Sequence, residues 1–284
     1  MAFFGAPSPG KENLKHLRMS LAQLQILSPC FIVGSALLFL GLERKFPYNS
    51  GQRAFRDGFW VDLIGYGVVQ SYLMGVIISA LIGAVDRWTG LSHHGLVSHW
   101  PIALQVAFFI LTHDLNTYLI HRAQHRSKVL WRTHEAHHSC TNVDWLSGIR
   151  SHSLEILMYQ TVEFLPVVLL GASPKVPLYK AMANAVYGMY IHSNLKIRMG
   201  KLLWVINGPE LHRWHHANDD QRAYDKNFAT KFTVWDRLLG TWFDPGENRA
   251  ADYGPSDGDF PEGWVSQHLF AFRPLPAMKE ATQA

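Results

Sequence analysis

Residues 121–139 read HRAQHRSKVLWRTHEAHHS, and this stretch holds five of the sixteen histidines in the chain. His121 and His125 form an i, i+4 pair, and residues 134–138 form an H-x-x-H-H pattern. The same H-x-x-H-H pattern recurs as HRWHH at residues 212–216. Because positions i, i+3 and i+4 share one face of a helix, we expect each cluster to aim its imidazoles in one direction.

A further histidine, His192 in YIHSN, stands at the end of the last apolar run and is positioned to supply a ninth imidazole. Nine imidazoles are too many for one ion, because zinc sites use about four ligands. Two ions with four or five ligands each would use them all. Imidazole suits Fe, Zn, Cu and Ni, so ligand type leaves the metal open. The nine candidate ligands are His121, His125, His134, His137, His138, His192, His212, His215 and His216.

The remaining histidines and the nearby acids are weaker candidates. We interpret His16, His93, His94, His99 and His268 as core or solvated side chains. A ligating histidine usually donates its second N–H to a carboxylate or a carbonyl. Asp114 is one candidate acceptor, because it lies two turns before the first cluster on the same helix face. His152 is an additional ligand or a hydrogen-bond donor to one. Other candidate acceptors are Glu135, Asp144, Glu155 and Asp236.

Long apolar runs surround these clusters and predict the fold class. Runs at about 24–42, 59–85, 154–172 and 176–195 approach the ~20 residues needed to cross a bilayer. A further run is apolar over 101–111 and then turns polar. So many runs are hard to bury in one soluble domain. We therefore predict an all-α integral membrane protein, with four to five transmembrane helices and a cytosolic helical cap that holds the dimetal site.

Composition shifts predict the domain organisation. We expect a polar N-terminal segment over 1–20, one membrane domain over 21–245 and an irregular tail over 246–284, which is rich in Pro, Gly and Asp. Segments 121–150 and 196–249 hold many Lys and Arg, which places the cap in the cytoplasm. The net charge of +4 comes from scattered residues, so nucleic-acid binding is not expected.

Three functions fit two metal ions held by histidines at a membrane face. The first is oxygen activation on a lipid. The second is zinc proteolysis, because His134, Glu135 and His138 also form a literal H-E-x-x-H. That match leaves the other histidines unexplained, and Arg213 occupies the place of the glutamate in the second cluster. The third is metal transport, which would favour polar residues in the middle of the helices rather than at their ends.

Five segments in this order resemble one family: HRAQHRSKVLWRTHEAHHS, NVDWLSGIRSHSLE, IHSNLKIRMG, GPELHRWHH and NFATKFTVWDRLLGT. The chain is similar to the fatty acid hydroxylase and sterol desaturase superfamily of membrane di-iron enzymes, in a bacterial branch near alkylglycerol monooxygenase. The resemblance covers about residues 100–245, and its histidine boxes are highly specific. Ser153 and Leu239 depart from residues common in the family, but neither lies in a box.

The resemblance implies a non-heme di-iron centre held by the nine candidate histidines, with zinc able to replace iron in purified protein. O2 and an external electron donor (ferredoxin, cytochrome or reductase) would then hydroxylate or desaturate a membrane lipid. A sterol, a carotenoid, an alkyl lipid and a fatty acyl chain are all compatible substrates. We expect the bacterial inner membrane as the location, and the sequence leaves the oligomeric state open.

Overall fold

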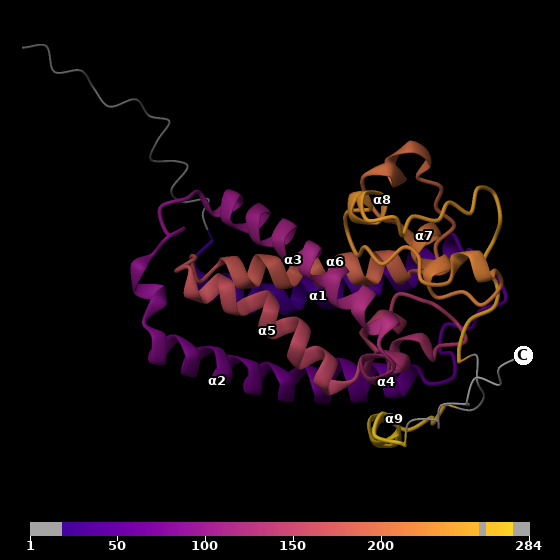
Figure 1. The fold of residues 1–284 in the computed structure, drawn as a ribbon, viewed down its shortest axis with the longest axis horizontal. Coiled ribbons are helices and arrows are strands. Elements are labelled where there is room, and N and C mark those ends of the chain that lie inside the picture. Colours follow the sequence, from indigo (N-terminus) through magenta and orange to yellow (C-terminus); the bar gives the residue numbers. More distant parts are fainter. Residues whose placement is uncertain (1–18, 256–259, 275–284) are drawn as a thin grey trace, which may run out of the picture.

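The apolar runs form long helices in the computed structural model, which describes residues 19–255 and 260–274. Within those residues the chain forms helices and isolated bridges but no named strand, in agreement with the all-α prediction. The long helices follow the long axis of the molecule (Figure 1). They are α1 Leu21–Lys45, α2 Ser71–Thr89, α3 Ile102–Arg126, α5 Ser153–Leu169 and α6 Val176–His192.

Local signals explain where these helices begin and end. The Ser20 hydroxyl accepts from the Gln23 amide while the Gln23 side chain accepts from the Ser20 amide, a capping box that starts α1. The π-helix η1 (Val61–Gln70) runs directly into α2. Gly90 ends α2 with φ +64°, a left-handed conformation that glycine adopts without a steric penalty.

Two segments are long and apolar enough to cross a membrane: α1, and the continuous helix Val61–Thr89. Both expose large apolar side chains, such as Leu37 on the first and Tyr72 on the second. The other three long helices do not meet the same criterion. α3 becomes polar in its second half, whereas α5 and α6 have 17 residues each, at the lower limit of the usual range of spans.

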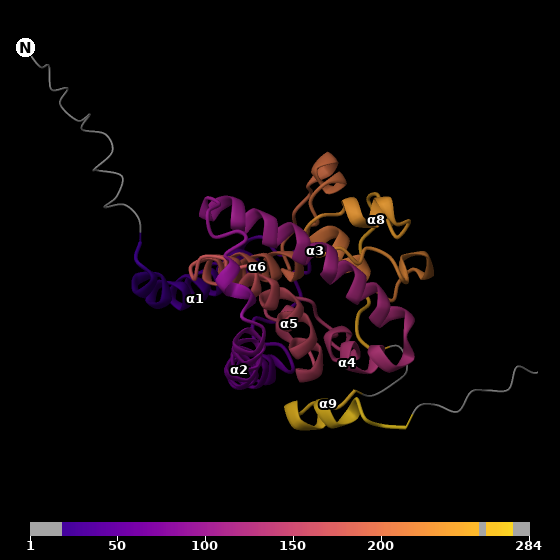
Figure 2. The ribbon, with the colours of Figure 1, turned by 60° about the vertical axis from the view of Figure 1, so that its left-hand side comes forward.

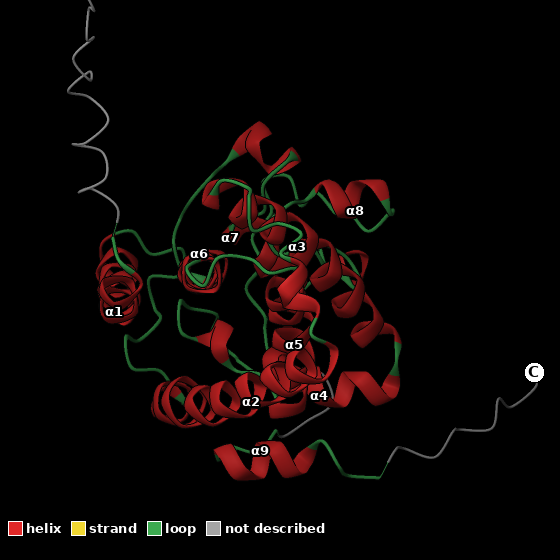
Figure 3. Ribbon diagram, turned by 90° about the vertical axis from the view of Figure 1, so that its left-hand side faces the viewer, coloured by secondary structure: helices red, strands yellow, loops and turns green. Residues whose placement is uncertain are grey.

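Short elements gather at one end of the long helices (Figure 1). We call this end the cap. It contains α4 (Lys128–His138), α7 (Pro209–His215) and α8 (Val234–Leu238). The short helices η3 (Ser147–Ile149), η4 (Gly200–Trp204) and η5 (Gln221–Ala223) lie between these segments in sequence, and η2 (Leu91–His94) links α2 to α3. Within the bundle, α1 packs against α6 and α2 against α5 (Figure 3).

A helix of seven residues, α9 (Trp264–Phe270), forms within the tail for which we expected irregular structure. Figures 1 and 2 show it against the outside of the bundle beside the segment that continues into α2. There the Tyr66 hydroxyl donates to the Gln267 side chain over 2.7 Å. The N-terminal segment up to residue 18, with His16, lies outside the described residues.

Candidate metal centre

Four helices bring the nine candidate histidines together at the cap end of the bundle. The C-terminal parts of α3 and α4, the last residue of α6, and α7 with the residue that follows it contribute them. Ser127 separates α3 from α4 and caps α4 by accepting from the Leu130 amide. Pro209 occupies the first turn of α7, where a missing amide hydrogen costs nothing.

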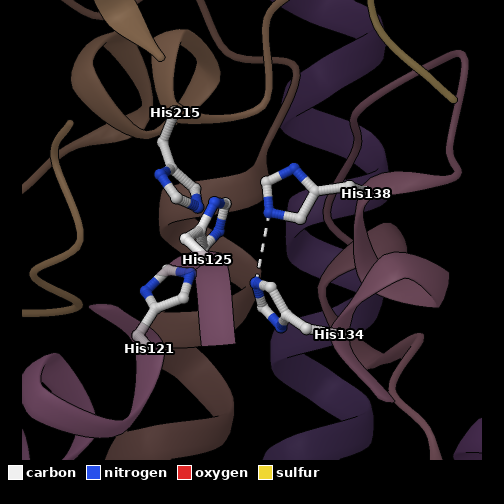
Figure 4. A group of neighbouring side chains, drawn as sticks. All are labelled: His121, His125, His134, His138 and His215. Atoms are coloured by element: carbon white, nitrogen blue, oxygen red, sulfur yellow. Dashed lines mark hydrogen bonds between the residues drawn. The ribbon is translucent and has the colours of Figure 1, made fainter. Parts of the chain in front are cut away.

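The nine side chains form two groups, and within each group the candidate ligand atoms lie within 4.8 Å of one another. Figure 4 shows the rings of the first group turned toward a common centre. The first histidine group is His121, His125, His134, His138 and His215. The second histidine group is His137, His192, His212 and His216.

Each H-x-x-H-H triplet is divided between the two groups. On α4, His134 and His138 enter the first group and His137 enters the second. At α7 the assignment is reversed, because His215 enters the first group and its two neighbours in the triplet enter the second. The expectation that each triplet aims in a single direction therefore needs refinement: one helix face serves two adjacent centres.

The Nδ1 atoms of several rings bond to backbone carbonyl groups outside the groups. In the second group, His137 donates to the Arg150 carbonyl over 3.1 Å and His192 donates to the Gly188 carbonyl over 2.9 Å. A carbonyl only accepts, so each Nδ1 carries the hydrogen, and the Nε2 atom of a neutral ring is then left with a free lone pair. Such hydrogen bonds fix the orientation of a metal-binding ring.

The Nε2 atoms of the second group then face one another. Those of His137 and His192 are 3.2 Å apart, and those of His192 and His212 are 2.8 Å apart. Two nitrogens bound at right angles to one ion at about 2.1 Å would be about 3.0 Å apart. In the first group, the buried Nε2 atoms of three rings have no hydrogen-bond partner among the described residues: His121, His125 and His215. Both groups therefore fit a metal ion.

Burial keeps these rings in the form that binds metal. It lowers the pKa of His137, His138 and His216 well below the usual value for histidine, and neighbouring imidazoles lower it further. The rings are therefore neutral near pH 7, and neutral imidazole is the ligand form.

One loop, residues 225–228, supports three rings of the first group. The Phe228 carbonyl accepts from His121 over 2.8 Å, and the Lys226 carbonyl accepts from His215 over 2.9 Å. The Asp225 carboxylate lies 3.6 Å from Nδ1 of His125. Sequence reasoning missed this loop, because backbone carbonyls leave no residue-type signal and nothing in the spacing singles out Asp225.

Two of the candidate acids act on the first group. Glu155 accepts from Nδ1 of His134 over 2.7 Å, as a second hydrogen-bond partner of a ligand would. Asp236 acts indirectly, because its carboxylate accepts from the amides of Phe228 and Ala229 and so holds the supporting loop. A third acid, Asp144, pairs with Arg56 over 2.8 Å instead of with an imidazole.

Asp114 and His152 lie outside both groups. The Asp114 carboxylate accepts from the amides of Lys231 and Phe232 and from the Trp235 indole, and it has no bond to an imidazole among the described residues. His152 caps α5, because its Nδ1 accepts from the Leu154 amide. Neither residue takes the role for which it was a candidate, because each satisfies backbone groups of a neighbouring segment.

Glu135 also points away from the imidazoles. Its carboxylate pairs with Arg273 over 2.7 and 2.9 Å. A zinc protease needs this glutamate beside the metal as its general base, so the arrangement does not favour the H-E-x-x-H interpretation. Among the histidines that we interpreted as core or solvated side chains, His93, His94 and His99 are exposed. His268 contacts His152, outside both groups.

The amino-acid sequence is similar to those of known proteins. The fatty acid hydroxylase family model matches residues 106–241. The ornithine lipid hydroxylase OlsE of Rhizobium tropici is 30% identical over 234 residues, which cover 79% of this chain and 69% of the relative. The human alkylglycerol monooxygenase is 30% identical over 50% of this chain but only 31% of its own length.

Methylsterol monooxygenase 1 of Rattus norvegicus is 27% identical over 126 residues, which cover 44% of this chain and 41% of the relative. No solved structure matches. The family match spans the end of the bundle that holds both histidine groups, and the similarity to the Rhizobium enzyme extends over most of both chains. The chain therefore belongs to the fatty acid hydroxylase family.

Proposed function

We propose that this protein is a membrane-bound di-iron oxygenase that hydroxylates a lipid. The observation that carries the proposal is the pair of histidine groups, with their Nε2 atoms facing one another at metal-ligand spacing. The relatives named above are hydroxylases or monooxygenases, and their names refer to lipids or sterols. These names favour hydroxylation over desaturation.

The proposed ligands are five imidazoles for one ion (His121, His125, His134, His138, His215) and four for the other (His137, His192, His212, His216). Two iron ions bound there would supply oxidising equivalents from O2 and two electrons. The protein supplies the fixed geometry. Outer hydrogen bonds orient the rings, and burial keeps them neutral and shields the centre from bulk water.

The membrane arrangement is part of the same proposal. Residues 21–245 form the membrane domain, with four to five spans that include the two segments of spanning length. The cap lies in the cytoplasm, at the bacterial inner membrane. An insoluble lipid would reach the centre from the bilayer, because the histidine groups lie where the long helices end. A ferredoxin, a cytochrome or a reductase would supply the electrons.

Metal content measured on detergent-purified protein tests the proposal. We expect close to two ions per chain, with iron present, and a lower number in His215→Ala. The exposed His99 provides the matched control, and His99→Ala should keep the wild-type count. The count is more informative than the identity, because zinc can replace iron during overexpression.

Lipid mass spectrometry of cells that express each variant tests the reaction. The wild type and His99→Ala should produce a lipid heavier by one oxygen atom, and His215→Ala should not. A lipid lighter by two hydrogen atoms would identify a desaturase. One zinc ion per chain, with full activity of His215→Ala, would contradict the oxygenase.

A further inference from the structure

Two cavities beside α7 share three lining residues: Tyr48, Arg213 and Arg249. Their volumes are about 400 Å³ and about 60 Å³. Tyr48 belongs to the loop that follows α1, and Arg249 belongs to the loop that follows α8. Neither cavity is lined by a histidine of the two groups, so this region is separate from the candidate metal centre.

Arg213 is a buried cation with unused hydrogen-bond donors. Its side chain is almost fully enclosed, with 2% of the residue exposed. Nη1 donates to the carbonyls of Ser193 and Leu195, over 2.8 and 3.2 Å. Nε and Nη2 have no partner among the described residues. These two atoms form the edge of a guanidinium that binds a carboxylate or a phosphate with two parallel hydrogen bonds.

The surroundings of Arg213 contain more positive than negative charge. Lys196, Arg198 and Arg249 also line the smaller cavity, where Glu210 is the single acidic lining residue. The Glu210 carboxylate accepts from the Met199 amide. The larger cavity has no acidic lining residue. A buried cation without an anionic partner is costly, so this charge distribution favours an external anion.

The two guanidinium groups share one aromatic ring. The Cζ atoms of Arg213 and Arg249 lie 3.8 and 4.3 Å from the centroid of the Tyr48 ring. The ring stabilises each cation, but it also holds two like charges near one another. An anion in the cavity would relieve that repulsion and would supply a counter-charge to the buried guanidinium, which lines both cavities.

The cavity lies at the cap end of the apolar helix α1. Tyr48 comes three residues after α1 ends at Lys45, and Asn194, which lines the larger cavity, follows the end of α6. At such a level a spanning helix leaves the hydrocarbon core and meets lipid headgroups. We propose that this arginine-lined cavity is an oxyanion site, which binds the phosphate or carboxylate of a lipid headgroup or the same group on a free anion.

The test compares two exposed arginines that both lie over aromatic rings. Arg249 lines the cavity, whereas Arg237 lies over Trp204 at 4.1 Å, outside it. Arg249→Gln is preferred to a change at Arg213, because Arg213 holds two backbone carbonyls and its loss could unfold the cap. Arg237→Gln is the matched control.

The readout is the thermal unfolding midpoint of the metal-loaded protein in detergent, since a ligand that binds the folded state raises it. Inorganic phosphate should raise the midpoint above that in chloride of equal ionic strength. Arg249→Gln should weaken the apparent phosphate affinity by about tenfold, the equivalent of about 1.4 kcal/mol. Arg237→Gln should respond as the wild type does.

A second titration uses phosphatidylglycerol, with phosphatidylcholine as its zwitterionic control. Stabilisation by phosphatidylglycerol alone identifies a lipid headgroup, and stabilisation by phosphate alone identifies a free anion. Absence of both effects in the wild type would overturn the proposal. So would an undiminished response in Arg249→Gln, which would place the anion elsewhere, for example on the metal ions. Because binding is measured rather than turnover, this outcome is independent of the proposed oxygenase activity.

Discussion

Glu155 shows how one residue outside the histidine groups controls a ring inside them. Its carboxylate accepts from Nδ1 of His134 and from the Gln124 side chain, over 2.7 and 3.1 Å. An ionised carboxylate at this position would make the opposite ring nitrogen more basic and therefore a stronger ligand. Glu135 is adjacent to His134 in sequence but pairs with Arg273, which lies far along the chain.

Glu155→Gln therefore tests the role of the charge. The amide keeps the size of the side chain but weakens its hydrogen bond with the ring, so we expect the metal affinity of the first group to fall by roughly 10- to 100-fold. Glu135→Gln is the control and should leave both affinity and turnover near wild type. A competition assay with a chelator measures the affinities. Equal losses in the two variants would contradict this assignment, and inactivity of Glu135→Gln alone would revive the protease.

The absence of a side chain at Gly148 leaves room for the His192 ring. A Cβ atom at this position would lie 2.5 Å from Nδ1 of His192, closer than real contacts allow. Gly148→Ala should push the His192 ring out of the second group and reduce the metal bound there. Gly188→Ala is the matched control, because its carbonyl accepts from the same ring but its Cβ atom would meet open space. Metal per chain, measured for both variants, distinguishes steric displacement from a general effect of added side chains.

At the scale of elements, α4 and α7 are too short to be stable alone. They have 11 and 7 residues, and isolated helices shorter than ~12–15 residues are marginal in water. Tertiary contacts must hold them. Arg150 provides one such contact, because its carbonyl accepts from His137 on α4 while its guanidinium binds Asp62 at the start of η1 over 2.7 Å. Arg56 binds the same carboxylate over 2.7 Å.

Asp62→Asn should destabilise this junction strongly. It removes one carboxylate shared by two buried arginines, and breaking a buried ion pair in this way costs about 3–5 kcal/mol. We expect a lower unfolding midpoint and a weaker second histidine group, because the Arg150 carbonyl loses its support. Asp57→Asn makes the same charge change at an exposed site a few residues earlier and should have little effect. Similar midpoints for the two variants would show that the network adds no stability.

At the scale of the whole molecule, the two histidine groups lie at one end of the long helices and η2 at the other (Figure 1). If the cap faces the cytoplasm, the η2 segment faces the opposite side. The exposed residues His94 in η2 and Arg237 in α8 therefore report on opposite sides of the membrane.

Thiol labelling in intact cells checks this topology. Single-cysteine variants would be made in a background in which Cys30 and Cys140 are replaced by serine. A reagent that cannot cross the inner membrane should label His94→Cys in intact cells but label Arg237→Cys only after the membrane is permeabilised. The reverse pattern would place the cap outside the cytoplasm, and equal labelling of both would contradict a spanning bundle.

The sequence was sufficient for the helical class and the family, and it singled out the nine histidines that form the two groups in the structure. Apolar runs and the H-x-x-H-H spacing depend on local periodicity, which a single chain displays directly. The sequence also made Glu155 a candidate hydrogen-bond partner of a ligand, but it could not distinguish Glu155 from Asp114 and His152. Spacing along α3 could not reveal that Asp114 binds the amides at 231–232, which lie more than one hundred residues away.

Only the tertiary structure decided how the histidines are shared and supported. The division of each triplet depends on how α4 and α7 face one another, and that arrangement arises from contacts between distant segments. The carbonyls of Arg150, Lys226 and Phe228 became supports through chain placement alone, since every residue has a carbonyl. The free edge of Arg213 is likewise a tertiary property. Local sequence determines which groups a chain offers, and packing determines which of them remain without a partner.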